Sequence, residues 1–267
     1  MISTGWLRDE EDFGFLQQQT AVTFSAPAEF VPPPKLSFRG ILHVESQGNM
    51  SSCVGHGGSS GLEALQYIAN RGRVQMSRMA MYLLAQRVSG IKGDRGATIA
   101  GCVQAMIDTG CCEEAEFPYP PQYVRDVPPA VIQQASRHKI LGHQKLNTYR
   151  DVFDWISQGK GPVIFGMTWW ERVANSRGLV TPNDLRGRTL GAHCKVFAGY
   201  SGEKDEDGEY LIDDLNSHGT GWGEGGWAKW TSRAIDALGN DPNTEMIGIT
   251  DITGFDAERL VDFSVIV

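Results

Sequence analysis

One of the five cysteines, Cys53, stands where a reactive thiol is expected, at the start of a segment with helical periodicity. A catalytic thiol must be partly ionised near neutral pH, and the first turn of a helix favours the thiolate through its free amides and its positive dipole end. Ser52, directly before it, is a residue type that caps such a turn. The competing interpretation is a small buried apolar side chain, the commoner role of cysteine.

Three other polar residues complete a candidate centre for nucleophilic catalysis. Gln47 precedes Cys53 in the same loop, and its amide can donate a hydrogen bond to the oxyanion of a tetrahedral intermediate, with the Cys53 amide as second donor. His193 is expected at the mouth of a strand, and Asn216 in the glycine-rich turn after the next strand. An asparagine carbonyl bound to one imidazole nitrogen turns the other toward the thiol. These residues predict a thiol hydrolase with Cys53 as nucleophile and His193 as base.

His56 is a second candidate for the base, because it lies three residues beyond Cys53 on nearly the same helical face. We rank it below His193, since a pair on one helix has no independent orienting residue. The C-x-x-H pattern of the pair suggests zinc, but no second ligand pair follows at finger or ribbon spacing, so we expect no metal. The mechanism requires no cofactor. Adjacent cysteines bridge each other poorly, so Cys111 and Cys112 receive no role.

The pattern of apolar residues changes near the middle of the chain. Helices are expected over residues 52–70, 77–88 and 98–109, with a short fourth over 149–158. Short apolar runs punctuated by glycine predict strands at 162–170, 194–200, 209–215 and 225–230. The expected class is α+β, a helical lobe followed by an antiparallel β half-barrel, with a cleft between them.

The expected organisation is a single catalytic domain over residues 1–267. Residues 1–40, with three consecutive prolines, are interpreted as an extended N-terminal arm. The mainly helical lobe follows over about 41–145, and the mainly β lobe over about 146–267.

Composition and charge exclude several classes of function. The formal charge is −8, and no basic run with interleaved aromatics is present, so nucleic acid is not an expected partner. No stretch of about 18 apolar residues predicts a membrane span, and acids occupy the N-terminal region where a signal peptide would be basic and then apolar. The odd number of cysteines at irregular spacings indicates a reducing compartment. We therefore expect the cytoplasm, or a virion if the chain is phage-encoded.

Four segments in a fixed order resemble the papain-like cysteine peptidases. QGNMSSC, residues 47–53, is similar to the Q-G-x-x-x-S-C segment of that family, and GAHCKVFAGY, residues 191–200, to its G-x-H-A-V-x-x-x-G-Y strand. NSHGTGWGEGGW, residues 216–227, is similar to the N-S-W-G-x-x-W-G turn, and residues 95–119 to the segment that leads to a Pro-Tyr pair. The opening GWLRDEEDF resembles bacterial members without a long propeptide. The resemblance implies a papain-like fold, with Cys53, His193, Asn216 and Gln47 in the active site and peptides or proteins as substrates.

The chain also departs from the family pattern. Met50 replaces a disulfide-forming cysteine, Val54 replaces the tryptophan after the nucleophile, and His218 replaces the tryptophan that shields the His-Asn hydrogen bond. Four glycines in the helix after Cys53 each cost about 1 kcal/mol relative to alanine, which close packing against a neighbour would explain. Trp169, Trp170 and Trp222 are candidates for either the cleft lining or the β-lobe core.

Two alternatives to a peptidase remain open at the level of sequence. The same residues can transfer acyl groups or cleave the amide bonds of peptidoglycan, as in a bacterial or phage wall hydrolase. The chain could also be a catalytically silent structural or assembly component that keeps the fold.

Overall fold

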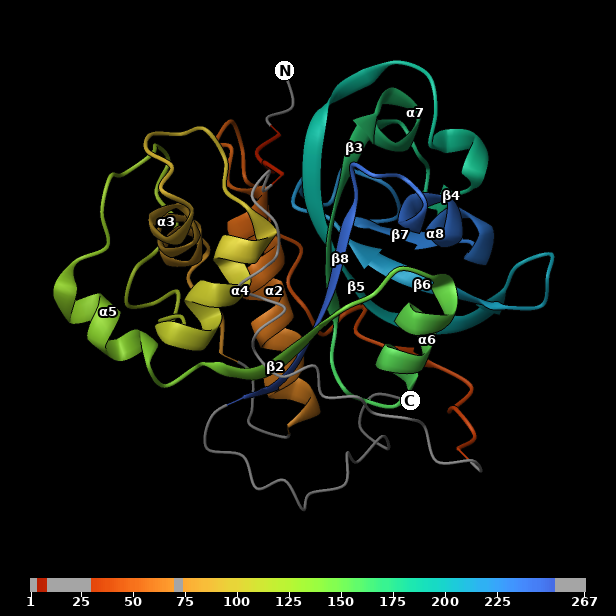
Figure 1. Cartoon of the computed structure of the whole chain (residues 1–267), viewed down its shortest axis with the longest axis horizontal. Helices are drawn as coiled ribbons and strands as arrows, with labels where there is room; N and C mark the ends of the chain where they lie inside the picture. Colours follow the sequence, from red (N-terminus) through yellow and green to blue (C-terminus); the bar gives the residue numbers. More distant parts are fainter. Residues whose placement is uncertain (1–3, 9–29, 70–73, 253–267) are drawn as a thin grey trace.

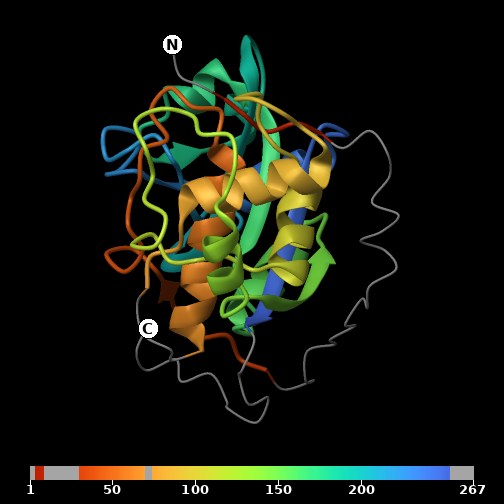
Figure 2. The same cartoon turned by 90° about the vertical axis from the view of Figure 1, so that its left-hand side faces the viewer.

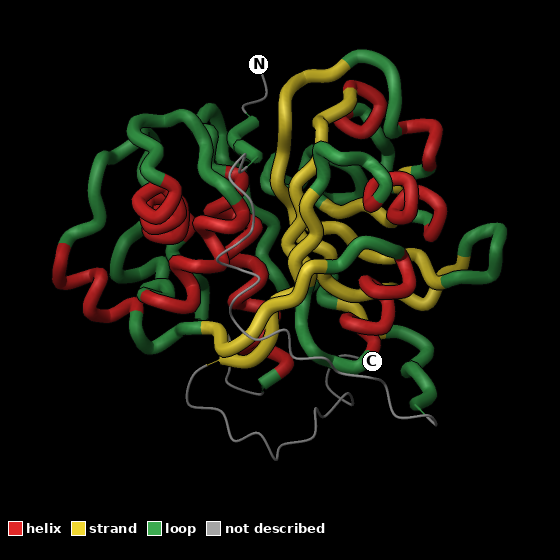
Figure 3. The backbone as a smooth tube through the Cα atoms, viewed as in Figure 1, coloured by secondary structure: helices red, strands yellow, loops and turns green. Residues whose placement is uncertain are grey.

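The computed structural model describes residues 4–8, 30–69 and 74–252, and in these the helices and strands lie in two halves (Figure 1). The first half contains α2 (Cys53–Ile68), α3 (Arg78–Ser89), α4 (Ile99–Asp108) and α5 (Pro129–Ala135). The second half is built on a sheet, which carries α6 (Tyr149–Ser157), α7 (Glu171–Ala174) and α8 (Ser232–Gly239). Figure 3 shows the longer helices of the first half on one side, and the strands with the shorter helices beside them on the other. The predicted α+β class is confirmed.

The sheet has eight strands among the described residues. Seven follow the order β2-β8-β3-β5-β6-β7-β4, with β1 paired to β5, and every pairing except β4 with β7 is antiparallel. Their bounds are β1 Leu36–Ser37, β2 Ile140–Lys145, β3 Val163–Trp170, β4 Leu179–Val180, β5 Thr189–Lys204, β6 Tyr210–Leu215, β7 Trp227–Trp230 and β8 Glu245–Ile252. The four predicted strands correspond to β3, β5, β6 and β7. The pairing of β2 with β8, more than 100 residues apart in the chain, was not predicted.

Three of the four predicted helices begin at residues that cap them. The side chains of Ser77, Thr98 and Thr148 accept hydrogen bonds from the first turns of α3, α4 and α6. Ser52 was expected to do the same for α2, and this prediction is wrong. Its hydroxyl instead lies 2.6 Å from the hydroxyl oxygen of Tyr119 and makes no capping bond. The amides of the α2 first turn are therefore not satisfied by the Ser52 side chain.

The glycines of α2 are explained by close packing on several sides of the helix. A Cβ atom at Gly55 would lie 2.5 Å from the carbonyl oxygen of Arg78, at the start of α3. At Gly58 it would lie 2.5 Å from a cysteine sulfur of α4, and at Gly61 2.9 Å from the Cδ1 atom of Ile249 on β8. Figure 2 views the molecule from the side of these helices, with the sheet behind them. The glycines allow α2 to pack tightly against both helices and the sheet.

Among the described residues, no helix has the length and apolar character needed to cross a membrane. The expected N-terminal arm is described only at 4–8 and 30–40, and its remaining residues lie outside the described ranges.

Candidate active site

Cys53 is the first residue of α2, and its side chain is fully buried. Burial raises the pKa of the thiol to about 11, although hydrogen bonds from the backbone of Cys194, Gly5 and Val54 act in the opposite direction. Cys194 directly follows His193 on β5, so the thiol lies beside the strand that carries the imidazole. The helix start therefore meets β5 at the predicted nucleophile.

Residues 4–8, which we call the covering segment, lie over this thiol. The amide of Ala97 donates to the carbonyl of Gly5 at 2.9 Å, and the amide of Leu7 donates to the carbonyl of Ala97 at 2.9 Å. Gly5 is so close to Ser51 that a Cβ atom would lie 1.8 Å from the Ser51 carbonyl oxygen. In Figure 1 the covering segment, drawn in red, passes between the helices and the sheet.

The side chain of Trp6 anchors the covering segment. It is 3% exposed and packs on Gly166 of β3, where a Cβ atom would lie 2.4 Å from the indole. The sequence did not predict that this segment covers the thiol. The sequence signals for this segment were the extended N-terminal arm expected over residues 1–40 and the resemblance of GWLRDEEDF to family members without a long propeptide.

His193 and Asn216 are joined by a hydrogen bond of 2.7 Å between Nε2 and Oδ1. The backbone amide of Ser217 donates to the same Oδ1 at 2.8 Å, which identifies this atom of the asparagine as the oxygen. Because Oδ1 only accepts, His193 Nε2 carries the hydrogen, and in the neutral ring Nδ1 is the acceptor nitrogen. Among the described residues, Nδ1 has no hydrogen-bond partner.

Two rings enclose the imidazole of His193. His218 stacks on it with ring centroids 4.5 Å apart and planes inclined at 17°, and Trp169 lies 4.7 Å away. Burial lowers the pKa of His193 well below its ordinary value, and the neighbouring charge of His218 lowers it further. His218 thus shields the ring, although the family pattern has tryptophan at this position. Trp169, Trp170 and Trp222 all belong to the buried core of the β half, and Trp169 also contacts the imidazole.

Gln47 is held by the turn that carries Asn216. Its Oε1 accepts from the hydroxyl of Ser217 at 2.7 Å, its Nε2 donates to the carbonyl of Met50 at 2.7 Å, and its backbone amide donates to the Ser217 carbonyl at 2.9 Å. The loop before α2 and the turn after β6 are therefore joined. The fold gathers all four sequence-predicted residues where α2 meets β5 and β6.

His56 faces a different set of groups. Its Nδ1 lies 3.1 Å from the carbonyl oxygen of Ser52, and its ring packs edge-on against Tyr119 at 4.9 Å. Burial lowers the pKa of His56 to about 3. Tyr119 in turn donates from its hydroxyl to the carbonyl of Gln47 at 3.0 Å. Through these contacts His56 and Tyr119 support the loop that carries Gln47.

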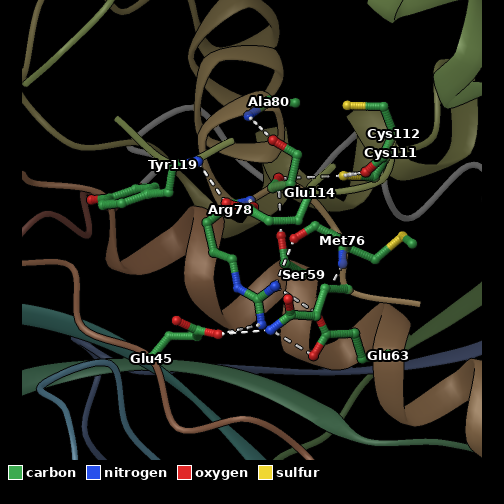
Figure 4. A network of polar contacts seen from close by, with 12 residues as sticks. Glu45, Ser59, Glu63, Met76, Arg78, Ala80, Cys111, Cys112, Glu114 and Tyr119 are labelled. Carbon is green, nitrogen blue, oxygen red and sulfur yellow. Dashed lines mark hydrogen bonds and ion pairs between the residues drawn. The ribbon is translucent and has the colours of Figure 1, made fainter. Parts of the chain in front are cut away.

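A buried ion pair in the helical half is linked to Tyr119 through Glu114 (Figure 4). Arg78 on α3 pairs with Glu63 on α2 at 2.7 Å, and the Arg78 backbone amide donates to Glu114 at 3.2 Å. The other oxygen of Glu114 accepts from the amide of Tyr119 at 2.5 Å. This network was not predicted from the sequence, because its members come from three separate segments: α2, α3 and the loop of Glu114 and Tyr119.

Among the residues that the structure describes, no cluster of three or more His, Cys, Asp or Glu side chains is arranged to hold a metal ion.

Comparison with solved structures shows similarity to several cysteine proteases. Xylellain from Xylella fastidiosa has a TM-score of 0.73 and 19% identity, with 93% of this chain and 96% of that chain covered. Digestive procathepsin L 3 of Tenebrio molitor has a TM-score of 0.68 and 18% identity, covering 84% and 72%. Bromelain from Ananas comosus, in complex with the E64 inhibitor, has a TM-score of 0.64 and 17% identity, covering 82% and 99%. These similarities establish the fold.

A search of curated proteins found no match. The sequence model of the papain family of cysteine proteases matches residues 35–244, which is most of the chain and includes the segments of Gln47, Cys53, His193 and Asn216. Membership of this family makes the protein a cysteine peptidase, a hydrolase of protein substrates. The chain therefore belongs to the papain family of cysteine proteases.

Proposed function

We propose that the protein cleaves peptide bonds with Cys53 as the nucleophile, His193 as the general base and acid, and Asn216 as the orienting residue. The observation that carries this proposal is the 2.7 Å hydrogen bond from His193 Nε2 to Asn216 Oδ1. It leaves Nδ1 of the neutral imidazole as the acceptor for a thiol proton. The position of the thiol beside Cys194, the next residue along β5, supports the same assignment.

The reaction proceeds in two halves. His193 takes the proton of Cys53, and the thiolate sulfur attacks the peptide carbonyl carbon. Gln47 Nε2 and the Cys53 backbone amide donate hydrogen bonds to the oxyanion, and the imidazolium gives its proton to the amine as the C–N bond breaks. Water then attacks the thioester while His193 removes its proton, and the carboxylic acid leaves with the thiol restored. No cofactor takes part in these steps.

The covering segment must move before a substrate reaches the sulfur. While it is in place, burial raises the pKa of Cys53 to about 11 and lowers that of His193, so both groups are neutral near pH 7. Water that enters after displacement of the segment stabilises the charged thiolate and imidazolium. The reactive ion pair therefore forms in the uncovered state.

Labelling with an epoxide thiol inhibitor, followed by identification of the modified residue, tests the assignment. We expect an adduct on Cys53 and none after Cys53→Ala. His193→Ala should abolish labelling at neutral pH, whereas His56→Ala should leave most of it. The reverse order for the two histidines would overturn His193 as the base.

The labelling is carried out in the wild-type protein and in a Trp6→Ala variant, so that covering of the thiol is not mistaken for lack of reactivity. If the Trp6→Ala variant is folded and still forms no adduct on Cys53, the protein is a catalytically silent scaffold. Parallel incubation with casein and with purified cell wall identifies the substrate. We expect release of peptides from casein, and turnover of cell wall alone would favour a wall amide hydrolase.

A further inference from the structure

A lysine is buried in the β half directly behind His193. Lys195 lies two residues beyond His193 on β5, so both side chains project from the same face of the strand. Lys195 forms an ion pair with Asp214 of β6, and both side chains are fully buried. Asp214 lies two residues before Asn216. The ion pair therefore joins β5 to β6 two residues away from the hydrogen bond between His193 and Asn216, the residue that directly follows β6.

Aromatic rings surround the ammonium group of Lys195. The distance from Nζ to the ring centroid is 4.9 Å for Trp222, 4.9 Å for Trp230, 5.3 Å for Trp169 and 5.4 Å for Phe165. Such contacts stabilise a cation most when water is excluded. The ring faces, together with the one carboxylate, replace the water that a lysine normally keeps.

Trp169 connects this buried cation to the imidazole. The centroid of its ring lies 5.3 Å from Lys195 Nζ and 4.7 Å from the centroid of the His193 ring. Asp214 is fixed in turn by the indole of Trp230, whose Nε1 donates to Oδ2 at 2.9 Å. A change in the ion pair therefore reaches His193 through one shared side chain.

Stability is a weak explanation for the ion pair. The family pattern G-x-H-A-V-x-x-x-G-Y has valine where this chain has Lys195. Replacing buried ion pairs by well-packed apolar residues is often neutral, or stabilising by roughly 1–4 kcal/mol. Asp214 also keeps one oxygen, Oδ1, without a hydrogen-bond partner among the described residues. A different role is needed to explain why two charges lie here.

We propose that Lys195 and Asp214 are positioning residues for His193: the ion pair ties β5 to β6 and holds Trp169 against the imidazole. This inference rests on the proposed role of His193 as general base and acid. The residues touch neither the substrate nor the reacting atoms, so they act on the rate through the orientation and charge of the imidazole.

Lys195 also contributes to the electrostatic environment of His193. Burial is the largest cause of the lowered pKa of His193, followed by His218 from the turn after β6. Lys195 on β5 and His56 on α2 lower it further, and the hydrogen bond to Asn216 raises it. From β3, His193 meets the uncharged ring of Trp169. Removal of the ammonium group should therefore raise the pKa of the imidazolium.

The test is the double variant Lys195→Met with Asp214→Asn. Methionine keeps an unbranched stem that packs on the rings, and asparagine keeps an oxygen that accepts from Trp230 Nε1. We expect kcat on a peptide substrate to fall by about 10- to 100-fold with little change in KM, as for a misplaced catalytic group. The alkaline limb of the kcat profile should move to higher pH, because Lys195 is among the groups that lower the pKa of His193 and Asp214 is not among those that raise it.

A matched control lies one residue away on β6. Asp213 points to the opposite face of the strand and pairs with Arg39 at 2.9 Å. The variant Arg39→Met with Asp213→Asn removes this ion pair and also the exposed pair of Arg39 with Glu224 at 3.0 Å. We expect it to lower the free energy of unfolding while kcat and the pH profile stay as in the wild type. A purely structural role for Lys195 and Asp214 predicts the same behaviour in both double variants.

A titration of labelled His193 by NMR gives a second measurement that does not depend on activity. We expect the imidazole pKa to be higher in the Lys195→Met, Asp214→Asn variant than in the wild type. Unchanged kcat, pH profile and imidazole titration, in a protein whose turnover requires Cys53, would overturn the positioning role alone. Turnover that survives Cys53→Ala would instead overturn the proposed function.

A milder variant covers the case in which the double variant does not fold. Trp230→Phe keeps an aromatic face for Lys195, removes the hydrogen bond to Asp214 and replaces a buried indole by a smaller ring. We expect the same changes in kcat and in the alkaline limb, reduced to a few-fold loss of kcat, consistent with about 1 kcal/mol for one hydrogen bond. Wild-type behaviour of Trp230→Phe on both measurements would contradict the proposal.

Discussion

The hydroxyl of Ser217 donates a hydrogen bond of 2.7 Å to Oε1 of Gln47, across a sequence separation of 170 residues. The backbone amide of the same serine donates to Oδ1 of Asn216 at 2.8 Å. The oxygen and nitrogen of an amide are distinguished by their hydrogen-bond partners. One residue therefore sets the orientation of both amides, one beside the imidazole and one beside the start of α2.

Ser217→Ala should lower kcat/KM by about fivefold to tenfold, because the lost hydrogen bond contributes about 1 kcal/mol to the orientation of the Gln47 amide. The measurement is steady-state hydrolysis of a peptide substrate. Ser201→Ala is the matched control, since the buried hydroxyl of Ser201 on β5 has no hydrogen-bond partner among the described residues. Equal activity of the two variants would show that the Gln47 amide is oriented by other contacts.

Trp6→Ala should increase the rate at which a small reagent alkylates Cys53 at pH 7. Loss of a buried tryptophan side chain typically costs 3–5 kcal/mol, so the covering segment should open more often and the rate should rise by at least about tenfold. Leu7→Ala is the control in the same segment, because the Leu7 side chain is 40% exposed. The alkylation rate is followed by mass spectrometry. Similar rates for both variants would mean that Trp6 does not hold the segment over the thiol.

His218→Trp should extend activity to higher pH. His193 must be protonated to give a proton to the leaving amine, so kcat falls as the pH rises through the pKa of the imidazolium. The charge of His218 lowers that pKa, and tryptophan removes the charge while keeping a flat ring for stacking. The alkaline limb of kcat against pH should therefore shift upward. His138→Gln, outside the site, serves as control, and a downward or absent shift in His218→Trp would contradict the assignment.

Gly55→Ala should destabilise the protein more than Gly57→Ala. The new Cβ at position 55 would meet the Arg78 backbone oxygen at 2.5 Å, whereas at position 57 the nearest atom is the side-chain sulfur of Cys194 at 3.1 Å. A backbone atom is harder to displace than a side-chain atom. Gly55→Ala should therefore lower the free energy of unfolding by about 1–3 kcal/mol. At Gly57 the strain is offset by up to about 1 kcal/mol of helix propensity. Urea unfolding measures both, and equal losses would contradict the packing explanation.

The elements that the sequence predicted depend on local signals. Helices α3, α4 and α6 follow from their periodicity and from capping residues within the same few positions, and the structure confirms them. Strands β3, β5, β6 and β7 follow from short apolar runs between glycines. Ser52 shows where the local signal fails, because a tyrosine 67 positions away takes the hydroxyl that the capping rule had assigned to the α2 amides.

The sequence by itself determined the residue types of the candidate site and the order Cys53, His193, Asn216, because short motifs keep them at recognisable places. Only the tertiary structure decided that the covering segment lies over the thiol, that Ser217 orients two amides, and that Lys195 and Asp214 form a buried pair behind His193. Each of these contacts joins segments far apart in the chain. Its formation depends on strand register and on burial, which no local pattern encodes.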